Sequence, residues 1–263
     1  MSIKIFQVDA FTSEPFKGNP AAVCILEKNV SDEWLQGVAT EMNLSETAFI
    51  TATEERNKYK LRWFTPKVEV DLCGHATLAT AHVLYQNNYV SSSETIFFET
   101  KSGILKTLKN ENYIQLDFPE TPVSDNELPK GIENIIGAKV MYSGKSIFDY
   151  FLLLEDEAQL INLKPNFGEL IKFGKRGIIV TAGSKKYDFI SRFFAPQSGI
   201  DEDPVTGSAH CALYPYWSKK LNKKELVAYQ ASERGGLLKL SSENSRILIS
   251  GEAITILEGV LKI

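Results

Sequence analysis

The feature that most constrains the fold of this chain is an internal repeat. One copy reads DLCGHATLATAH around Gly74, and the other reads PVTGSAHCAL around Gly207, 133 residues later. In each copy a second glycine, Gly103 or Gly236, follows 29 residues after the first and opens a Gly-apolar-Leu-Lys segment. Self-similarity over this range predicts two homologous lobes with the same order of elements.

The flanks of the repeat show where the copies differ. Arg62 opens RWFTP and Arg192 opens RFFAP, which gives an offset of 130 ahead of the glycines. The second copy therefore carries three additional residues, and they fall within 197–205, where Asp203 ends an acidic triplet. Glu46 is a second acidic residue found in one copy only, because the residue 130 positions later is Arg176. Residues found in one lobe are the ones to which chemistry can have been added.

The repeat predicts an α/β (α+β) protein with two pseudo-symmetric lobes. We expect an N-terminal lobe over 1–118, a linker rich in proline and charge over 119–131, and a C-terminal lobe over 132–252. A closing hairpin over 253–263 is expected to complete one of the lobes. Helices are expected over 74–86 and 207–217, and the alanines of the first make it apolar on several sides. Each lobe should therefore wrap a curved, mostly antiparallel sheet around a central helix.

Composition and charge exclude several classes of function. The net charge is −4 and the pI is about 5.6, so the chain has no basic excess with which to bind nucleic acid. No apolar run is long enough to cross a membrane, and the start of the sequence does not resemble a signal peptide. Three cysteines without Cys-x-x-Cys spacing favour a reducing compartment. We therefore expect a cytoplasmic protein with no membrane or nucleic-acid partner.

The chemistry-bearing residues do not form a familiar metal or hydrolase motif. His75, His82 and His210 lack the spacing of a metal site, so no metal is expected. Ser208 lies in TGSAH and not in the Gly-x-Ser-x-Gly elbow of a serine hydrolase. The loop that ends near Asn19 either connects a hairpin or lines a substrate site, and it lacks the Gly-Lys-Ser/Thr of a phosphate loop.

The starts of the two repeated helices are the strongest candidates for ligand binding. Gly74 and Gly207 allow close approach to backbone N–H groups, and the helix dipole favours an anion there. The alternative is that both glycines merely permit tight helix packing. Cys73 is the cysteine placed for reactivity, because a helix N-terminus lowers the pKa of a thiol, whereas Cys24 and Cys211 lie in apolar runs and are expected in the core.

Four blocks of sequence carry a resemblance that spans the chain. They are VDAFT with GNPAAV, MNLSETAF, DLCGHAT, and EDPVTGSAH, in that order. Together they resemble the PhzF-type phenazine-biosynthesis isomerase family, whose fold is similar to that of diaminopimelate epimerase, with the active site between two lobes. The resemblance implies a cofactor-independent, homodimeric isomerase that acts on a small carboxylate. It also implies that Glu46 is the general acid/base and that His75, Asp203 and Ser208 contact the substrate.

One departure from the epimerases bears on the reaction. Those enzymes place a cysteine at the start of each central helix, whereas this chain has Cys73 in the first position and Thr206 in the second. Proton transfer by Glu46 therefore favours isomerisation of a small cyclic or unsaturated carboxylic acid, as in a trans-2,3-dihydro-3-hydroxyanthranilate isomerase. The alternatives are an amino-acid racemase or epimerase that uses Cys73 with Glu46, and a non-catalytic protein that binds small anions.

Overall fold

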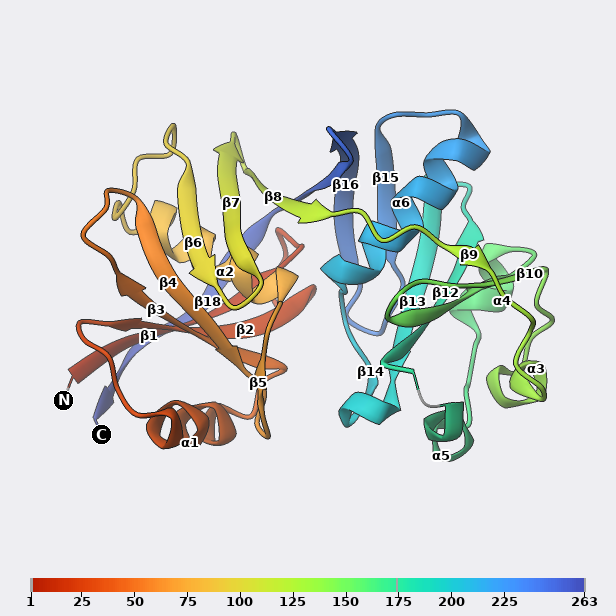
Figure 1. The fold of residues 1–263 in the computed structure, drawn as a ribbon, viewed down its shortest axis with the longest axis horizontal. Coiled ribbons are helices and arrows are strands. Elements are labelled where there is room, and N and C mark those ends of the chain that lie inside the picture. Colours follow the sequence, from red (N-terminus) through yellow and green to blue (C-terminus); the bar gives the residue numbers. More distant parts are fainter. Residues whose placement is uncertain (1, 174, 263) are drawn as a thin grey trace. The chain divides into compact units, whose positions relative to one another are not determined.

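A computed structural model describes residues 2–173 and 175–262. The chain divides into two compact units (Figure 1). Unit 1 takes the residues up to Phe118 together with those from Leu248 onward, and unit 2 takes Pro119–Ile247. Each unit contains a sheet and one long helix that starts at a repeated glycine, Gly74 or Gly207. The mixed α+β architecture predicted from the repeat is therefore confirmed, and each unit is described by itself.

Unit 1 is a mostly antiparallel sheet with two helices. Its strands run in the order β18-β1-β2-β3-β4-β6-β7-β8, and the β2–β3 and β4–β6 pairs are parallel. A short strand, β5, pairs with β4, and β17 pairs with β8. The elements are β1 (Ser2–Ala10), β2 (Asn19–Leu26), α1 (Asp32–Met42), β3 (Glu46–Ala52), β4 (Lys58–Phe64), β5 (Glu69–Val70), α2 (Gly74–Gln86), β6 (Ile96–Thr100), β7 (Gly103–Asn110), β8 (Tyr113–Pro119), β17 (Arg246–Gly251) and β18 (Ala253–Lys262).

Helix α2 forms the centre of unit 1 and has the bounds predicted from the sequence. It packs against β1, β2 and β3, and its small residues, such as Ala76 and Ala79, are fully buried. The hydroxyls of Thr77 and Thr80 donate to the carbonyls of residues four positions earlier, so these polar groups are satisfied inside the core. In Figure 1, α1 lies on the outside of the sheet, where Ser31 caps it as predicted.

Unit 2 repeats the strand arrangement of unit 1. Its strands run in the order β9-β10-β11-β12-β13-β15-β16, with parallel β11–β12 and β13–β15 pairs and with β14 on β13. The elements are β9 (Ser124–Asp125), α3 (Ile132–Ile136), β10 (Tyr142–Lys145), β11 (Asp149–Leu153), α4 (Glu157–Ile161), α5 (Phe167–Leu170), η1 (Ile171–Phe173), β12 (Gly177–Gly183), β13 (Phe189–Ala195), η2 (Pro196–Ser198), β14 (Ile200–Glu202), α6 (Gly207–Leu221), β15 (Leu226–Gln230) and β16 (Gly236–Glu243). Two parallel pairs at equivalent places in both units are the structural counterpart of the sequence repeat.

The C-terminal segment differs from the predicted hairpin. Ala253–Lys262 forms one continuous strand, β18, that pairs antiparallel with β1 along its whole length. Gly259, in the middle of the predicted hairpin segment, lies opposite Ile5 within the strand pairing. The long pairing satisfies the backbone hydrogen-bonding groups of the segment, so no turn is needed. The register shifts between Gln7 and Val8, which accommodates one additional residue of β18.

Strand register also corrects the sequence alignment of the two copies. The repeated arginine of β4 lies opposite Phe49, whereas that of β13 lies opposite Val180, so the offset in this strand is one residue larger than expected. Glu46 therefore corresponds to Gly177, and Arg176 immediately precedes that position. Glu46 still has no acidic counterpart in unit 2.

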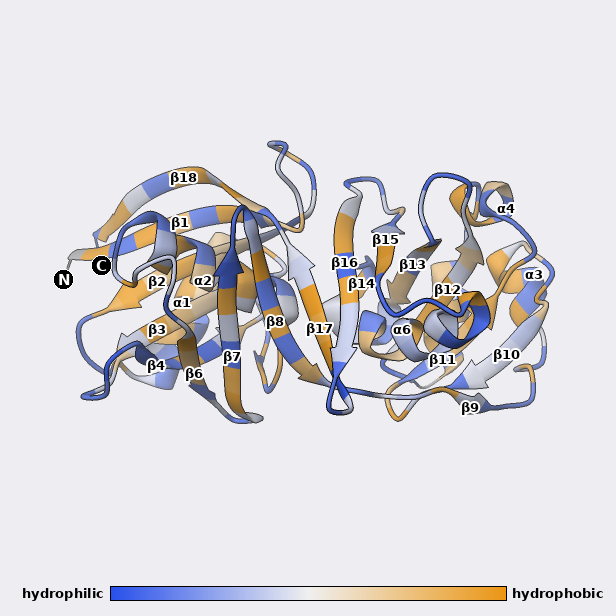
Figure 2. Cartoon of the chain, turned by 90° about the horizontal axis from the view of Figure 1, so that it is seen from above, coloured by the Kyte–Doolittle hydropathy of each residue, from blue (hydrophilic) through white to orange (hydrophobic). Residues whose placement is uncertain are grey.

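The hydropathy of the strands explains which faces are buried. Hydrophobic and hydrophilic residues alternate along β1 and β8 (Figure 2), as expected for strands with one face in the core. In β8 the buried residues are Ile114, Leu116 and Phe118. No helix within the described residues is long and apolar enough to cross a membrane.

Candidate active site

The N-terminal end of α2 brings a carboxylate and an imidazole together. Glu46 is the first residue of β3, and His75 is the second residue of α2. Glu46 Oε2 lies 3.0 Å from His75 Nε2. The Glu46 side chain is 18% exposed and that of His75 is 6% exposed, so the pair combines a largely buried imidazole with a carboxylate that solvent and ligands can reach.

Asn19 determines how His75 is oriented. Its Nδ2 lies 3.2 Å from Nδ1 of His75, and Asn19 is fully buried at the start of β2. When Asn19 donates to Nδ1, the neutral imidazole carries its hydrogen on Nε2, the nitrogen that lies 3.0 Å from Glu46 Oε2. Burial lowers the pKa of His75, but the interactions with Cys73 and Glu46 outweigh it and raise that pKa well above its usual range. Since the imidazolium also carries an Nε2–H, an N–H group of His75 lies beside the Glu46 carboxylate in either protonation state.

Cys73 lies beside this pair as a buried thiol. Its Sγ is 3.6 Å from His75 Nδ1 and 4.0 Å from Nε2. Burial, followed by the charge of Glu46, raises the pKa of Cys73 to about 11. The prediction that the helix N-terminus lowers this pKa is therefore wrong, because desolvation outweighs the dipole. Cys24 and Cys211 are buried as predicted, with pKa values raised by burial to about 12.

A second polar cluster surrounds the start of α6 in unit 2. The Thr206 hydroxyl lies 2.5 Å from Asp203 Oδ2, and the Thr206 N–H donates to Gln230 Oε1 at 2.8 Å. Gln230 is fully buried, and its Nε2 donates to Thr206 Oγ1 and to the carbonyl of Asp203. Because Gln230 donates to the threonine oxygen, the threonine hydrogen is directed to Asp203. Gln230 and Thr206 thus hold the Asp203 carboxylate as an acceptor in a fixed orientation.

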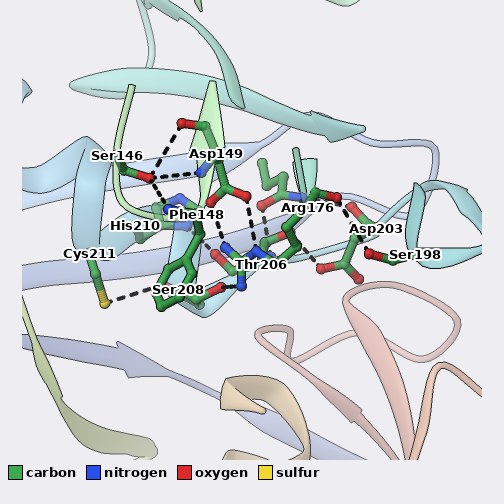
Figure 3. Close-up of polar contacts among 12 residues, drawn as sticks. Ser146, Phe148, Asp149, Arg176, Ser198, Asp203, Thr206, Ser208, His210 and Cys211 are labelled. Carbon is green, nitrogen blue, oxygen red and sulfur yellow. Dashed lines mark hydrogen bonds and ion pairs between the residues drawn. The ribbon is translucent and has the colours of Figure 1, made fainter. Parts of the chain in front are cut away.

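Ser208, the second residue of α6, is contacted by an arginine (Figure 3). Arg176 Nη1 donates to Ser208 Oγ at 3.1 Å. The same guanidinium forms a bidentate pair with Asp149, with Nε–Oδ1 at 2.9 Å and Nη2–Oδ2 at 2.5 Å. Sequence analysis did not assign Arg176 and Asp149 to the site, since they lie 27 residues apart and match no motif.

The two central helices also differ from α1, α4 and α5 at their N-termini. Ser31, Asp156 and Asn166 each cap a helix by accepting a backbone N–H, and these helices carry acidic residues in the first turn. Within the described part of the chain, the side chains of Cys73 and Thr206 make no such capping bond. Neither α2 nor α6 has an acidic residue in its first turn. Their N–H groups and dipoles are therefore suited to bind an anionic ligand.

The structure places the eight predicted site residues in two sets. Five lie at the start of α2 in unit 1, and three lie at the start of α6 in unit 2. The members are Asn19, Glu46, Cys73, Gly74 and His75 in the first set, and Asp203, Gly207 and Ser208 in the second. The other histidines have structural surroundings: His82 contacts Thr255, and His210 contacts the carbonyl of Thr206.

The first set also contains potential metal ligands. Among the described residues, ligand atoms of Glu46, Cys73 and His75 lie within 4.8 Å of one another. Sequence spacing did not reveal this group, because Glu46 comes from a different strand. Carboxylate, thiolate and imidazole are ligands that Zn²⁺ accepts, so the expected absence of a metal stays a prediction.

Comparison with known proteins shows extensive similarity. The model of the phenazine biosynthesis-like proteins (PhzC-PhzF) matches residues 8–259. An uncharacterized isomerase of Halalkalibacterium halodurans is 51% identical over 264 residues, covering 99% of each chain. The crystal structure of a PhzF-family phenazine biosynthesis protein from Enterococcus faecalis superposes with a TM-score of 0.95 at 44% identity, covering both chains completely. A hydroxyproline epimerase from Agrobacterium vitis has a similar fold, with a TM-score of 0.64 at 11% identity over 99% of this chain and 92% of the epimerase.

Proposed function

Because this chain belongs to the family of phenazine biosynthesis-like proteins, we propose that it is a cofactor-independent isomerase of a small cyclic or unsaturated carboxylic acid. The reaction moves a proton from one carbon to another, as in the isomerisation of trans-2,3-dihydro-3-hydroxyanthranilate. The observation that carries this proposal is the Glu46–His75 pair at the uncapped start of α2. Relatives that are named isomerases and a fold shared with epimerases support the same class of reaction.

Glu46 is the proposed proton carrier. His75 Nε2 lies 3.0 Å from Oε2, so that oxygen is held and Oε1 is the one we assign to proton transfer. A carboxylate at this position removes a proton from a carbon made acidic by the neighbouring unsaturation and returns it to a second carbon of the same system. His75 keeps the carboxylate in place and stabilises its negative charge before the proton is taken up.

The proposed ligand is a carboxylate because both central helices offer hydrogen-bond donors to an anion at their starts. The backbone N–H groups at Gly74 and Gly207 belong to uncapped helix ends, which favour an anion. We assign Ser208 to the carboxylate, and Asp203 to another polar group of the substrate. Asn19 and Cys73 belong to the site through their contacts with His75.

The buried thiol of Cys73 counts against the racemase alternative. Two-base inversion requires a second group that can exchange a proton with carbon. A thiol with a pKa of about 11 is almost entirely protonated at neutral pH, so little thiolate is present to remove a proton. The equivalent position in unit 2 is Thr206, whose hydroxyl donates to Asp203. Glu46 is the remaining candidate for proton transfer, which favours isomerisation.

Turnover in D₂O tests the proposal. Purified protein is incubated with trans-2,3-dihydro-3-hydroxyanthranilate and with related unsaturated carboxylic acids, and NMR follows both rearrangement and deuterium at carbon. An isomerase should rearrange at least one acid, with deuterium at the carbon that receives the proton. A protein that binds these acids without either change would be an anion-binding protein, and the proposal would be wrong.

A further inference from the structure

Arg176 contacts Ser208 but has no role in the proposed proton transfer. We propose that Arg176 is a positioning residue that makes the Ser208 hydroxyl an obligate hydrogen-bond donor. The start of α6 then binds a group that only accepts hydrogen bonds, a carboxylate, and rejects the corresponding carboxamide. This inference rests on the proposed function, because it takes the ligand to be a carboxylic acid.

The direction of the hydroxyl follows from the chemistry of arginine. A guanidinium has N–H donors and no acceptor, so its 3.1 Å contact with Ser208 Oγ occupies an oxygen lone pair. The hydroxyl hydrogen of Ser208 cannot point at Arg176 and must be directed elsewhere. The neighbouring backbone groups at the start of α6, at Gly207 and Ser208, are N–H donors too. A carboxamide would bring its own N–H₂ against these donors, whereas a carboxylate would not.

The surroundings of Arg176 keep its guanidinium in this orientation (Figure 3). Asp149, whose side chain is 2% exposed, binds it in a bidentate manner. The rings of Phe148 and Phe193 lie 5.0 and 5.5 Å from the guanidinium carbon. Gly177 leaves room for the Phe193 ring, since a Cβ there would lie 2.2 Å from its Cζ atom. These four residues constrain a side chain that is 36% exposed and would otherwise be mobile.

Equivalent positions at the starts of α2 and α6 have partners of opposite charge. His75 and Ser208 are both the residue after the repeated glycine. In unit 1 the partner of this position is the acceptor Glu46, and in unit 2 it is the donor Arg176. Asp149 balances the charge of Arg176, so the arginine acts on the geometry of Ser208 more than as a free positive charge. The α6 end is therefore built for binding, whereas the α2 end offers a group that can take up a proton.

Calorimetric titration with anthranilate and 2-aminobenzamide tests this inference. The two probes have nearly the same shape, but one presents a carboxylate and the other a carboxamide. The wild type should bind anthranilate at least about tenfold more tightly than the amide. In Arg176→Met, the Ser208 hydroxyl can rotate and accept from the amide, so this preference should fall by at least about threefold, and the backbone N–H groups of the helix start account for what remains. Ser208→Ala should weaken the preference to the same extent, and the double variant should be no worse than Ser208→Ala.

Arg62→Met is the matched control. Arg62 is an arginine of similar exposure, 32%, that forms a bidentate pair with Glu69 in unit 1. It should keep the wild-type preference, which separates the role of Arg176 from the general loss of an ion pair. Arg176→Gln offers an amide oxygen that can accept from the Ser208 hydroxyl, and it provides the measurement if Arg176→Met does not fold.

Three results would overturn the inference. One is a folded Arg176→Met or Arg176→Gln protein with the wild-type preference for anthranilate. Another is loss of the preference in the Arg62→Met control. The third is a wild type that binds both probes equally. None of these results bears on the proposed proton transfer, which is tested separately by deuterium incorporation and by the Glu46→Gln variant.

Discussion

Replacing Glu46 by Gln should abolish proton transfer with little change in ligand binding. Gln keeps the shape of the side chain and loses its basicity. A positioned general acid/base contributes roughly a hundredfold to ten-thousandfold to a rate, which corresponds to about 3 to 5 kcal/mol in the activation barrier. The groups assigned to the carboxylate, at Gly74, Gly207 and Ser208, are unchanged, so the Kd should move by less than about threefold.

The structure also gives the effect of this substitution on stability. In the wild type, His75 Nε2 faces a carboxylate at 3.0 Å, and in the variant it can face an amide oxygen. Replacing the carboxylate by a neutral amide at this contact lowers the free energy of unfolding by about 1 kcal/mol. For a protein of this size that lowers the Tm by about 2 to 4 °C. A loss of stability this small cannot account for the expected loss of rate.

Single-turnover kinetics and calorimetry separate the two effects. The rate of rearrangement measures proton transfer, anthranilate titration measures binding, and thermal unfolding confirms that the variant is folded. Cys73→Ser serves as the comparison and should cost less than about tenfold in rate, because the proposed base is Glu46 and the pKa of the buried thiol is raised to about 11. The assignment of Glu46 would be refuted if the Glu46 variant kept deuterium incorporation while the Cys73 variant lost it.

Three further predictions concern pH, metal and assembly. Burial lowers the pKa of His210 to about 4, so the folded protein should lose stability as the pH falls from about 6.5 to 4, and the Tm of His210→Gln should depend less on pH in that range. Exhaustive chelation should leave turnover unchanged, and activity that returned only with an added divalent ion would contradict metal independence. Leu257 and Val260 of the edge strand β18 are about half exposed, and with the family resemblance they suggest a homodimer. Light scattering should give twice the chain mass of 29.4 kDa, and a monomer mass at micromolar concentration would contradict the dimer.

The sequence by itself determined the architecture and the centres of both units. The repeat around Gly74 and Gly207 predicted two central helices, and α2 has the predicted bounds. This succeeded because the signals are local: a run of small apolar residues after a glycine specifies a buried helix wherever the rest of the chain lies. The family resemblance assigned Glu46 and His75 to the site, since neither residue has a distinctive pattern of its own, and their 3.0 Å contact was seen only in the structure.

Tertiary structure alone decided the pKa shifts and the hydrogen-bond partners of the side chains around these helices. Cys73 occupies a helix start, which by itself would lower its pKa, but burial raises it. Arg176, just ahead of β12, and Gln230, at the end of β15, contact Ser208 and Thr206. Both lie far from these residues in the sequence, so no local pattern predicts the contacts. The same holds for the pairing of β18 with β1, two strands from opposite ends of the chain. Burial and long-range hydrogen bonds depend on which segments meet, and the chemistry of a side chain is set by those neighbours more than by its own identity.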